Sequence, residues 1–381
     1  MPDAPAEAIR TAFSASADPA RAARELAEAL ESPALGFVLF FCSADYPLAA
    51  LGEALEAAFA PVPLAGCTTA GEITPEGYGR GCIVAIGFDR PDFAIACARV
   101  EDLEGFALPR AQRLVDGLLA DCRRQAPPEG ARPFVLTLLD GLSSSEEQVL
   151  ATLEAALGGI ASFGGSAGDD NRLHHTHVYA DGAFHSASAV VVMVTSRRPF
   201  EVFTTHHLRP RREKLVVTAV DRARRRVLEL NAAPAAEEYA RLVGRPVTAL
   251  DAGVFARHPL AVRIGEGHYV RSIQGVDDDG GLRFYCAVEK GIVLTAMRPA
   301  PMLEELDDVL ADLARRLGPA SLVLGCDCFL RRLELEADGR LADASRLLAR
   351  ARVVGFNTYG EQHQGMHINQ TFTGVAIATG D

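Results

Sequence analysis

Short apolar runs and amphipathic segments follow one another along the chain in an order that occurs three times. Each copy opens with an apolar run typical of a buried strand, continues through a helical pattern and a second strand, and ends in a turn. Each turn consists of a hydroxyl residue, any residue, glycine and a carboxylate, at 69–72, 166–169 and 358–361. Three matches at the same place in the same unit indicate an internal repeat.

The copies open at Phe37, Phe134 and Leu322, and helices are predicted over 48–59, 145–157 and 341–350. Another apolar strand follows each turn, at 82–88, 188–195 and 371–378. A helix between consecutive strands makes those strands parallel neighbours. The pattern therefore predicts an α/β fold with mixed β-sheets and outer helices, built from recurring strand-helix-strand-turn units in two lobes.

A different stretch separates the second copy from the third and contains short β patterns between residues 201 and 296, with a turn signal at 277–281. Arginines at 222 and 224–226 fall between two apolar runs, which indicates the solvated tip of a hairpin rather than a nucleic-acid site. Two more helices are predicted, from Asp18 through residue 30 and from Pro301 onward. Leucines recur with 3,4 spacing in the latter, which favours a core face and leaves a homodimer seam as the alternative.

At 381 residues the chain is long enough for two domains, and we expect a helical segment over 1–33 and domains over 34–232 and 233–381. Apolar runs are much shorter than the roughly 20 residues that span a bilayer. The N-terminus lacks the pattern of a signal peptide, so we expect a cytoplasmic protein. The net charge of −12 disfavours nucleic acid as a partner. Eight cysteines in such a chain are expected to be buried thiols rather than disulfides.

The residues of the three turns are the candidates for a ligand-binding site. Glycine can provide a backbone with positive φ, while the flanking hydroxyl and carboxylate point into the space at the sheet edge, where α/β proteins often bind ligands. We expect them to line one or two clefts, with the third turn serving the C-terminal lobe; alternatively, each carboxylate accepts a backbone N–H of its own turn. The candidate ligand-binding residues are Cys67, Thr68, Thr69, Glu72, Gly165, Ser166, Asp169, Asn357, Thr358, Glu361, His367 and Asn369.

Two kinds of chemistry compete with simple binding. Residues 164–168 match the Gly-x-Ser-x-Gly pattern of serine hydrolases, but the sequence after Ser166 does not predict the helix that such a nucleophile requires. Histidines at 174, 175 and 177 and cysteines at 326 and 328 form no complete zinc set within their own segments. Haem needs only one axial histidine beside an apolar pocket and stays open as a cofactor. No catalytic residue is assigned, and we expect a protein that is not an enzyme.

Three segments together resemble the signature of FIST signal-transduction proteins: 66–73, 164–170 and 355–361 with 367–371. The stretch from His258 to Gly291 is similar to the start of the C-terminal domain of that family. The resemblance runs from about residue 34 to 378. It implies a FIST N-terminal domain followed by a FIST C-terminal domain.

The resemblance also implies a function. FIST proteins are thought to sense small ligands such as amino acids, and some bind haem and sense nitric oxide. Members occur alone or joined to outputs such as histidine kinases and cyclic-dinucleotide enzymes, so we expect a small-molecule ligand and a separate signalling partner of that kind. A haem-binding nitric-oxide sensor is the alternative.

Overall fold

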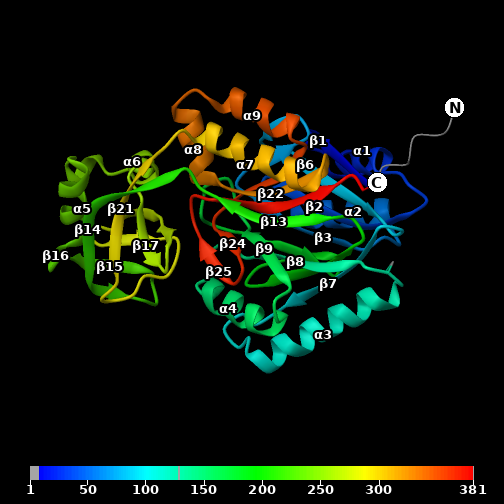
Figure 1. The fold of residues 1–381 in the computed structure, drawn as a ribbon, viewed down its shortest axis with the longest axis horizontal. Coiled ribbons are helices and arrows are strands. Elements are labelled where there is room, and N and C mark those ends of the chain that lie inside the picture. The colour runs from blue at the N-terminus through cyan, green and yellow to red at the C-terminus, as the bar shows by residue number, and fades with distance from the viewer. Residues whose placement is uncertain (1–7, 128, 381) are drawn as a thin grey trace.

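Three six-stranded sheets with helices outside them build a larger lobe, and an eight-stranded sheet builds a smaller one beside it (Figure 1). The computed structural model describes residues 8–127 and 129–380. The predicted α/β class, with mixed sheets, outer helices and two lobes, is confirmed. Within the described residues, no helix is both long and apolar enough to cross a membrane.

The three sheets of the larger lobe repeat one plan. In each, two neighbouring strands run parallel, an antiparallel strand of the same unit flanks them on one side, and a short hairpin flanks them on the other. The first sheet consists of β1 (Ile9–Ser14), β6 (Ile83–Asp89), β2 (Leu35–Ser43), β3 (Leu64–Thr69), β10 (Val178–Ala180) and β11 (Ala183–His185). The second consists of β7 (Phe93–Val100), β12 (Ala189–Ser196), β8 (Arg132–Leu139), β9 (Ala161–Ser166), β24 (Glu361–His363) and β25 (Met366–Ile368). The third consists of β13 (Phe200–Thr205), β26 (Phe372–Ala378), β22 (Ala320–Cys328), β23 (Val353–Thr358), β4 (Glu72–Thr74) and β5 (Gly77–Gly79).

The short hairpins link the three units in a cycle. The hairpin that follows the first turn, β4–β5, pairs with β23 of the third unit. The second unit's hairpin, β10–β11, pairs with β3, and the third unit's hairpin, β24–β25, pairs with β9. Because each unit completes the sheet of another, the third unit lies in the larger lobe with the first two. Our expectation that the third turn serves a separate C-terminal lobe is therefore wrong.

Helices cover the outer faces of the sheets. The helices are α1 (Pro19–Ala29) and α2 (Leu48–Phe59) on the first sheet, α3 (Leu108–Arg124) and α4 (Glu146–Leu157) on the second, and α7 (Met302–Leu317), α8 (Phe329–Ala337) and α9 (Leu341–Arg350) beside the third. Asp18 begins α1 by accepting the Arg21 N–H at 2.7 Å, as predicted. The inner faces share one core, where the rings of Phe41 and Phe356 stack 4.4 Å apart.

The smaller lobe is inserted between β13 and α7. It contains β14 (Leu208–Asp221), β15 (Arg226–Leu230), β16 (Ala233–Pro234), α5 (Ala235–Val243), η1 (Val247–Ala249), α6 (Ala252–Arg257), β17 (Leu260–Ile264), β18 (Gly267–Arg271), β19 (Ile273–Val276), β20 (Leu282–Phe284) and β21 (Val293–Pro299). The two segments that connect the lobes lie side by side, and the Ala300 N–H of one donates to the His207 carbonyl of the other at 2.7 Å.

The N-terminal segment over 1–33 is only partly helical. Residues 1–7 lie outside the described residues, and β1 pairs with β6 along its whole length before α1 begins. All eight cysteines are free thiols, seven of them buried and Cys97 half-buried. This confirms the expectation of thiols rather than disulfides.

Candidate functional site

The three turns meet and are hydrogen-bonded to one another through their backbones. Between the first and third turns, the Ala70 N–H donates to the Asn357 carbonyl at 2.9 Å, and the Asn357 N–H donates to the Gly71 carbonyl at 2.7 Å. Between the second and third, the Ser166 N–H donates to the Gly360 carbonyl at 2.8 Å. The cyclic exchange of hairpins therefore gathers the turns into one closed ring.

The glycines of the turns serve close packing more than backbone conformation. Only Gly71 has positive φ, at 136°. A Cβ on Gly168 would lie 2.5 Å from the Ala70 nitrogen, and a Cβ on Gly360 would lie 1.9 Å from Nε2 of His367. The expectation of a positive φ is thus wrong for Gly168 and Gly360, where glycine instead lets a neighbouring group approach the backbone.

In the first turn, the hydrogen-bonding groups of Glu72 are satisfied by residues of the same repeat unit. Thr69 Oγ1 donates to Oε1 of Glu72 at 2.6 Å, and the other Glu72 oxygen accepts from Sγ of Cys82 at 3.2 Å. Burial raises the pKa of Glu72, and it raises the pKa of the Cys67 thiol well above its ordinary value. Thr68 Oγ1 accepts the His177 N–H at 3.0 Å. Thr68, Thr69 and Glu72 therefore have partners within the described residues.

The second turn departs from this pattern. Asp169 accepts the backbone N–H groups of 173–175 at 2.7 to 2.9 Å and the hydroxyl of Tyr359. Burial would raise the pKa of Asp169, but these hydrogen bonds lower it. Asp169 therefore fits the local alternative, in which the carboxylate binds nearby backbone. Ser166 donates instead to Glu146, and Gly165 pairs with Glu361 in the register of β9 and β24.

The third turn resembles the first in its internal bond, since Thr358 donates to Glu361. The other Glu361 oxygen accepts the N–H and hydroxyl of Thr371 at 3.1 and 2.9 Å. Burial raises the pKa of Glu361 to about 8. Asn357 Oδ1 accepts from Arg332 at 3.1 Å. This turn is also buried, but the hairpin that follows it continues to the smaller lobe.

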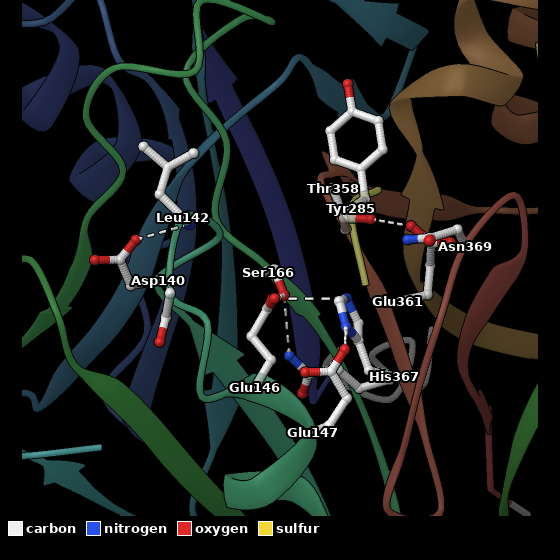
Figure 2. A network of polar contacts seen from close by, with 12 residues as sticks. Asp140, Leu142, Glu146, Glu147, Ser166, Tyr285, Thr358, Glu361, His367 and Asn369 are labelled. Atoms are coloured by element: carbon white, nitrogen blue, oxygen red, sulfur yellow. Dashed lines mark hydrogen bonds and ion pairs between the residues drawn. The ribbon is translucent and has the colours of Figure 1, made fainter. Parts of the chain in front are cut away.

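A charged cluster joins the lobes beside the third turn (Figure 2). Arg225, from the turn between β14 and β15, donates to Glu146 at 3.0 Å and to Glu147 at 2.8 Å. His367 Nδ1 lies 3.2 Å from Glu147 Oε1, and its Nε2 lies 3.6 Å from Glu146 Oε1. Only 12% of the Arg225 side chain is exposed, so the expectation of a solvated hairpin tip is wrong for this arginine, although Arg224 is 75% exposed.

Burial and the neighbouring charges shift the pKa values of the residues in this cluster. Burial raises the pKa of Glu146. Burial alone would raise the pKa of Glu147 as well, but the hydrogen bond from His367 and the charges of His367 and Arg225 hold it well below its ordinary value. Burial alone would lower the pKa of His367, but the two carboxylates raise it. His367 and Arg225 therefore lie against two carboxylates at the lobe interface.

Backbone groups complete the contact between the lobes. The Ser272 N–H donates to Asn369 Oδ1 at 3.3 Å, and Arg271 donates to the His367 carbonyl at 3.1 Å. From the smaller lobe, the Ala287 N–H also donates to Glu147 at 2.7 Å. These contacts are polar, and they place His367 and Asn369, two of the predicted residues, on the interface.

Buried polar atoms without a hydrogen-bond partner concentrate in this part of the described chain. They include Ser272 Oγ, Arg225 Nε, Gln362 Oε1, His367 Nε2, Asn369 Nδ2 and both ends of the Gln370 carboxamide. Sequence reasoning did not select Ser272, Gln362, Gln370, Arg225, Glu146 or Glu147 as site residues. The short polar run after Ile368 was the available signal for Gln370, whereas Arg225 reaches the site only through the fold.

The turns do not line the larger cavities of the described residues. All twelve candidate residues are buried. Cavities of about 440 and 500 Å³ lie between α7 and α9, and one of about 390 Å³ lies beside β1 and α9, and none of the twelve lines them. The structure therefore brings the turn residues together in a sealed ring, from which Ser166 of the second turn and the segment after the third turn reach the interface.

Haem and metal ions do not fit the described residues. No group of three or more His, Cys, Asp or Glu in the described chain could hold a metal ion. A haem requires an apolar pocket with a histidine in its wall. The three larger cavities have no histidine among their lining residues, and the cavity that His363 lines is only about 10 Å³.

Comparisons with known proteins define the family. A model of the FIST N domain matches residues 36–233, and a model of the FIST C domain matches residues 235–364. The chain belongs to the FIST family, whose domains are associated with signal transduction and small-ligand sensing. The boundary between the two matches falls inside the smaller lobe, so the division into family domains does not coincide with the two lobes.

Other comparisons add little. A crystal structure of a cyanuric acid hydrolase from A. caulinodans is similar to this chain with 12% sequence identity and a TM-score of 0.27, covering 50% of this chain and 71% of that one. A likeness at this level carries no argument about activity. A search of curated proteins gave no significant match.

Proposed function

We propose that the protein is a cytoplasmic sensory module that binds a small ligand, such as an amino acid or related metabolite, between its two lobes. The observation that carries this proposal is the group of buried, unpartnered polar atoms at the interface, on Ser272, Asn369 and Gln370 above all. A buried polar group without a partner costs about 1–3 kcal/mol. A ligand with complementary groups would offset that cost, and the family's association with ligand sensing supports the same role.

Entry of the ligand requires the lobes to separate. The interface combines polar contacts, such as Arg225 to Glu146 and Ser272 to Asn369, with one aromatic cluster, and interfaces between domains commonly permit relative motion unless they are large and hydrophobic. Ligand binding would then shift the population of open and closed forms, provided the ligand has different affinities for them. A separate partner, such as a histidine kinase or a cyclic-dinucleotide enzyme, would detect that shift.

We propose binding without catalysis, and the geometry at Ser166 supports this. In a serine hydrolase, the imidazole stands between the nucleophilic hydroxyl and the carboxylate. Here Glu146 stands between them, because it accepts from Ser166 and lies 3.6 Å from His367 Nε2. Among the described residues, this order places no imidazole against the Ser166 hydroxyl to take its proton.

A thermal-shift screen of the full chain against amino acids and related metabolites tests the proposal. We expect at least one compound to raise the unfolding temperature, and Asn369→Ala to weaken its binding about tenfold or more. Gln148→Ala is the matched control, since Gln148 is exposed and its carboxamide donates only to the Glu104 carbonyl within the larger lobe. Binding that is unchanged in Asn369→Ala, or turnover of the bound compound, would contradict the proposal.

A further inference from the structure

Gln370 is the most unusual polar residue at the lobe interface. Its side chain is buried, with 1% of the residue exposed, and neither Oε1 nor Nε2 has a hydrogen-bond partner among the described residues. Its backbone also has positive φ, at 53°. Non-glycine residues seldom adopt this conformation, and such strain often accompanies ligand clamps. Gln370 therefore has two separate energetic costs, an unpartnered buried carboxamide and a strained backbone.

The surroundings of Gln370 belong to the same interface. Asn369 precedes it and accepts the Ser272 N–H of the smaller lobe, which leaves Asn369 Nδ2 and Ser272 Oγ unpartnered. The next residue, Thr371, donates twice to Glu361. Segment 369–371 is therefore fixed on both sides, to the smaller lobe by Asn369 and to the third turn by Thr371, while the Gln370 carboxamide between them has no partner.

Aromatic rings pack close to this segment. Cys328, whose sulfur faces the Gln370 backbone N–H, belongs to a cluster with Phe329 and Tyr359. Tyr285 of the smaller lobe joins these rings, at 5.5 Å from Phe329 and 6.5 Å from Tyr359 between centroids. Aromatic rings from both lobes thus lie in the cluster that contacts the backbone of segment 369–371, which suits a flat ligand group nearby.

We propose that Gln370 recognises a neutral ligand group that presents an N–H beside a carbonyl, as a primary carboxamide or a lactam ring does. The inference rests on the proposed ligand site and names the chemistry of its ligand. A carboxamide offers one acceptor and two donors in a fixed plane, so it pairs through two hydrogen bonds with a group of the same kind. Asn369 Nδ2 and Ser272 Oγ supply further donors beside it.

The charges of the interface favour a neutral group. Arg225 and His367 already lie against Glu146 and Glu147. A carboxylate brought to Gln370 would add a negative charge to a buried region, and a buried charge without a partner is strongly disfavoured. A neutral amide edge satisfies the free atoms without that cost.

Matched probes test this directly by calorimetric titration of the full chain. Nicotinamide and uracil carry the proposed edge, whereas nicotinate replaces it with a carboxylate and 1,3-dimethyluracil lacks the N–H groups. We expect nicotinamide or uracil to bind at least tenfold more tightly than its counterpart. Equal affinities within both pairs, or no binding of nicotinamide and uracil, would overturn the inference.

Two variants connect the result to Gln370. Gln370→Met keeps the length of the side chain and removes its polar atoms, so we expect an unchanged or higher unfolding temperature and at least a tenfold loss of probe affinity. Gln364→Met is the control, because Gln364 is exposed and has a similar φ of 46°. Probe binding that survives Gln370→Met would overturn the inference. If only nicotinate or other metabolites bind, and depend on Asn369, the sensing function stands and the amide inference falls.

Discussion

The first and third turns have the same sequence pattern and the same internal hydrogen bond, from threonine to the glutamate three residues later. Their surroundings differ. Each glutamate is completed by the residue ten positions later, but Cys82 follows a hairpin that pairs within the larger lobe, whereas Thr371 follows the segment that contacts the smaller lobe. The shared motif therefore builds the ring of turns, whereas the residues that follow the motif determine whether a turn leads to a ligand site.

The largest expected effect is on the cluster beside the third turn. Arg225→Met leaves Glu146 and Glu147 without their arginine, and breaking such a pair costs about 3–5 kcal/mol. Denaturant unfolding should show this loss. Arg224→Met is the control, because Arg224 directly precedes Arg225 and is exposed. It should change the free energy of unfolding by less than about 0.5 kcal/mol. Equal effects of the two would contradict a charged contact between the lobes.

The second effect depends on pH. Because the folded protein raises the pKa of Glu361 to about 8, the folded state holds a proton that the unfolded state has released above its own value near 4.5. Stability should therefore fall as the pH rises from 5 to 8, by roughly 3 kcal/mol from this group. His367, whose pKa is also raised, contributes in the same direction.

Glu361→Gln sharpens this prediction, since the amide cannot ionise. Unfolding free energies of the variant, measured at several pH values, should fall less steeply between pH 5 and 8 than those of the natural protein. An identical slope would show that Glu361 does not carry a raised pKa.

Substitution of the turn glycines should have a smaller effect on stability and should distinguish the first turn from the third by its effect on ligand binding. Gly71→Ala forces alanine into a φ of 136° and against Arg332, while Gly360→Ala moves the ring of His367, and each should cost roughly 2 kcal/mol. Only Gly360→Ala should weaken ligand binding, as titration of both variants would reveal. Equal loss of binding would remove the distinction between the turns.

The smallest effect concerns the shared hydrogen bond. Thr69→Val and Thr358→Val each remove a donor to a buried glutamate, and each should lower the free energy of unfolding by about 1–2 kcal/mol. Parallel denaturation curves would show equal losses if the bond is structural in both turns. A loss confined to one turn would mean that the motif has different roles.

Local pattern predicted the elements well. The helices over 48–59 and 341–350 have the predicted bounds, because their apolar spacing is strong and their ends have turn signals. The strand β1 and the helix α8 were missed. In the short segment of β1, pairing with β6, more than sixty residues away, decides the structure, and such pairing leaves no local signal.

The candidate site was predicted only in part. His367 and Asn369, predicted to line a cleft of the C-terminal lobe, lie instead at the interface between the lobes, and the turns are sealed by hydrogen bonds with one another. Arg225 could not be found, since its neighbours suggested an exposed hairpin tip and only the docking of the smaller lobe buries it. The exchange of hairpins between units is likewise a long-range feature.

Hydrogen–deuterium exchange, measured with and without a compound that stabilises the protein, tests the central claim most directly. Ligand between the lobes should slow exchange in 271–273 and 362–371 and leave 68–72 unchanged. Protection confined to the first turn, or protection absent from the interface while the compound is bound, would contradict a ligand site between the lobes.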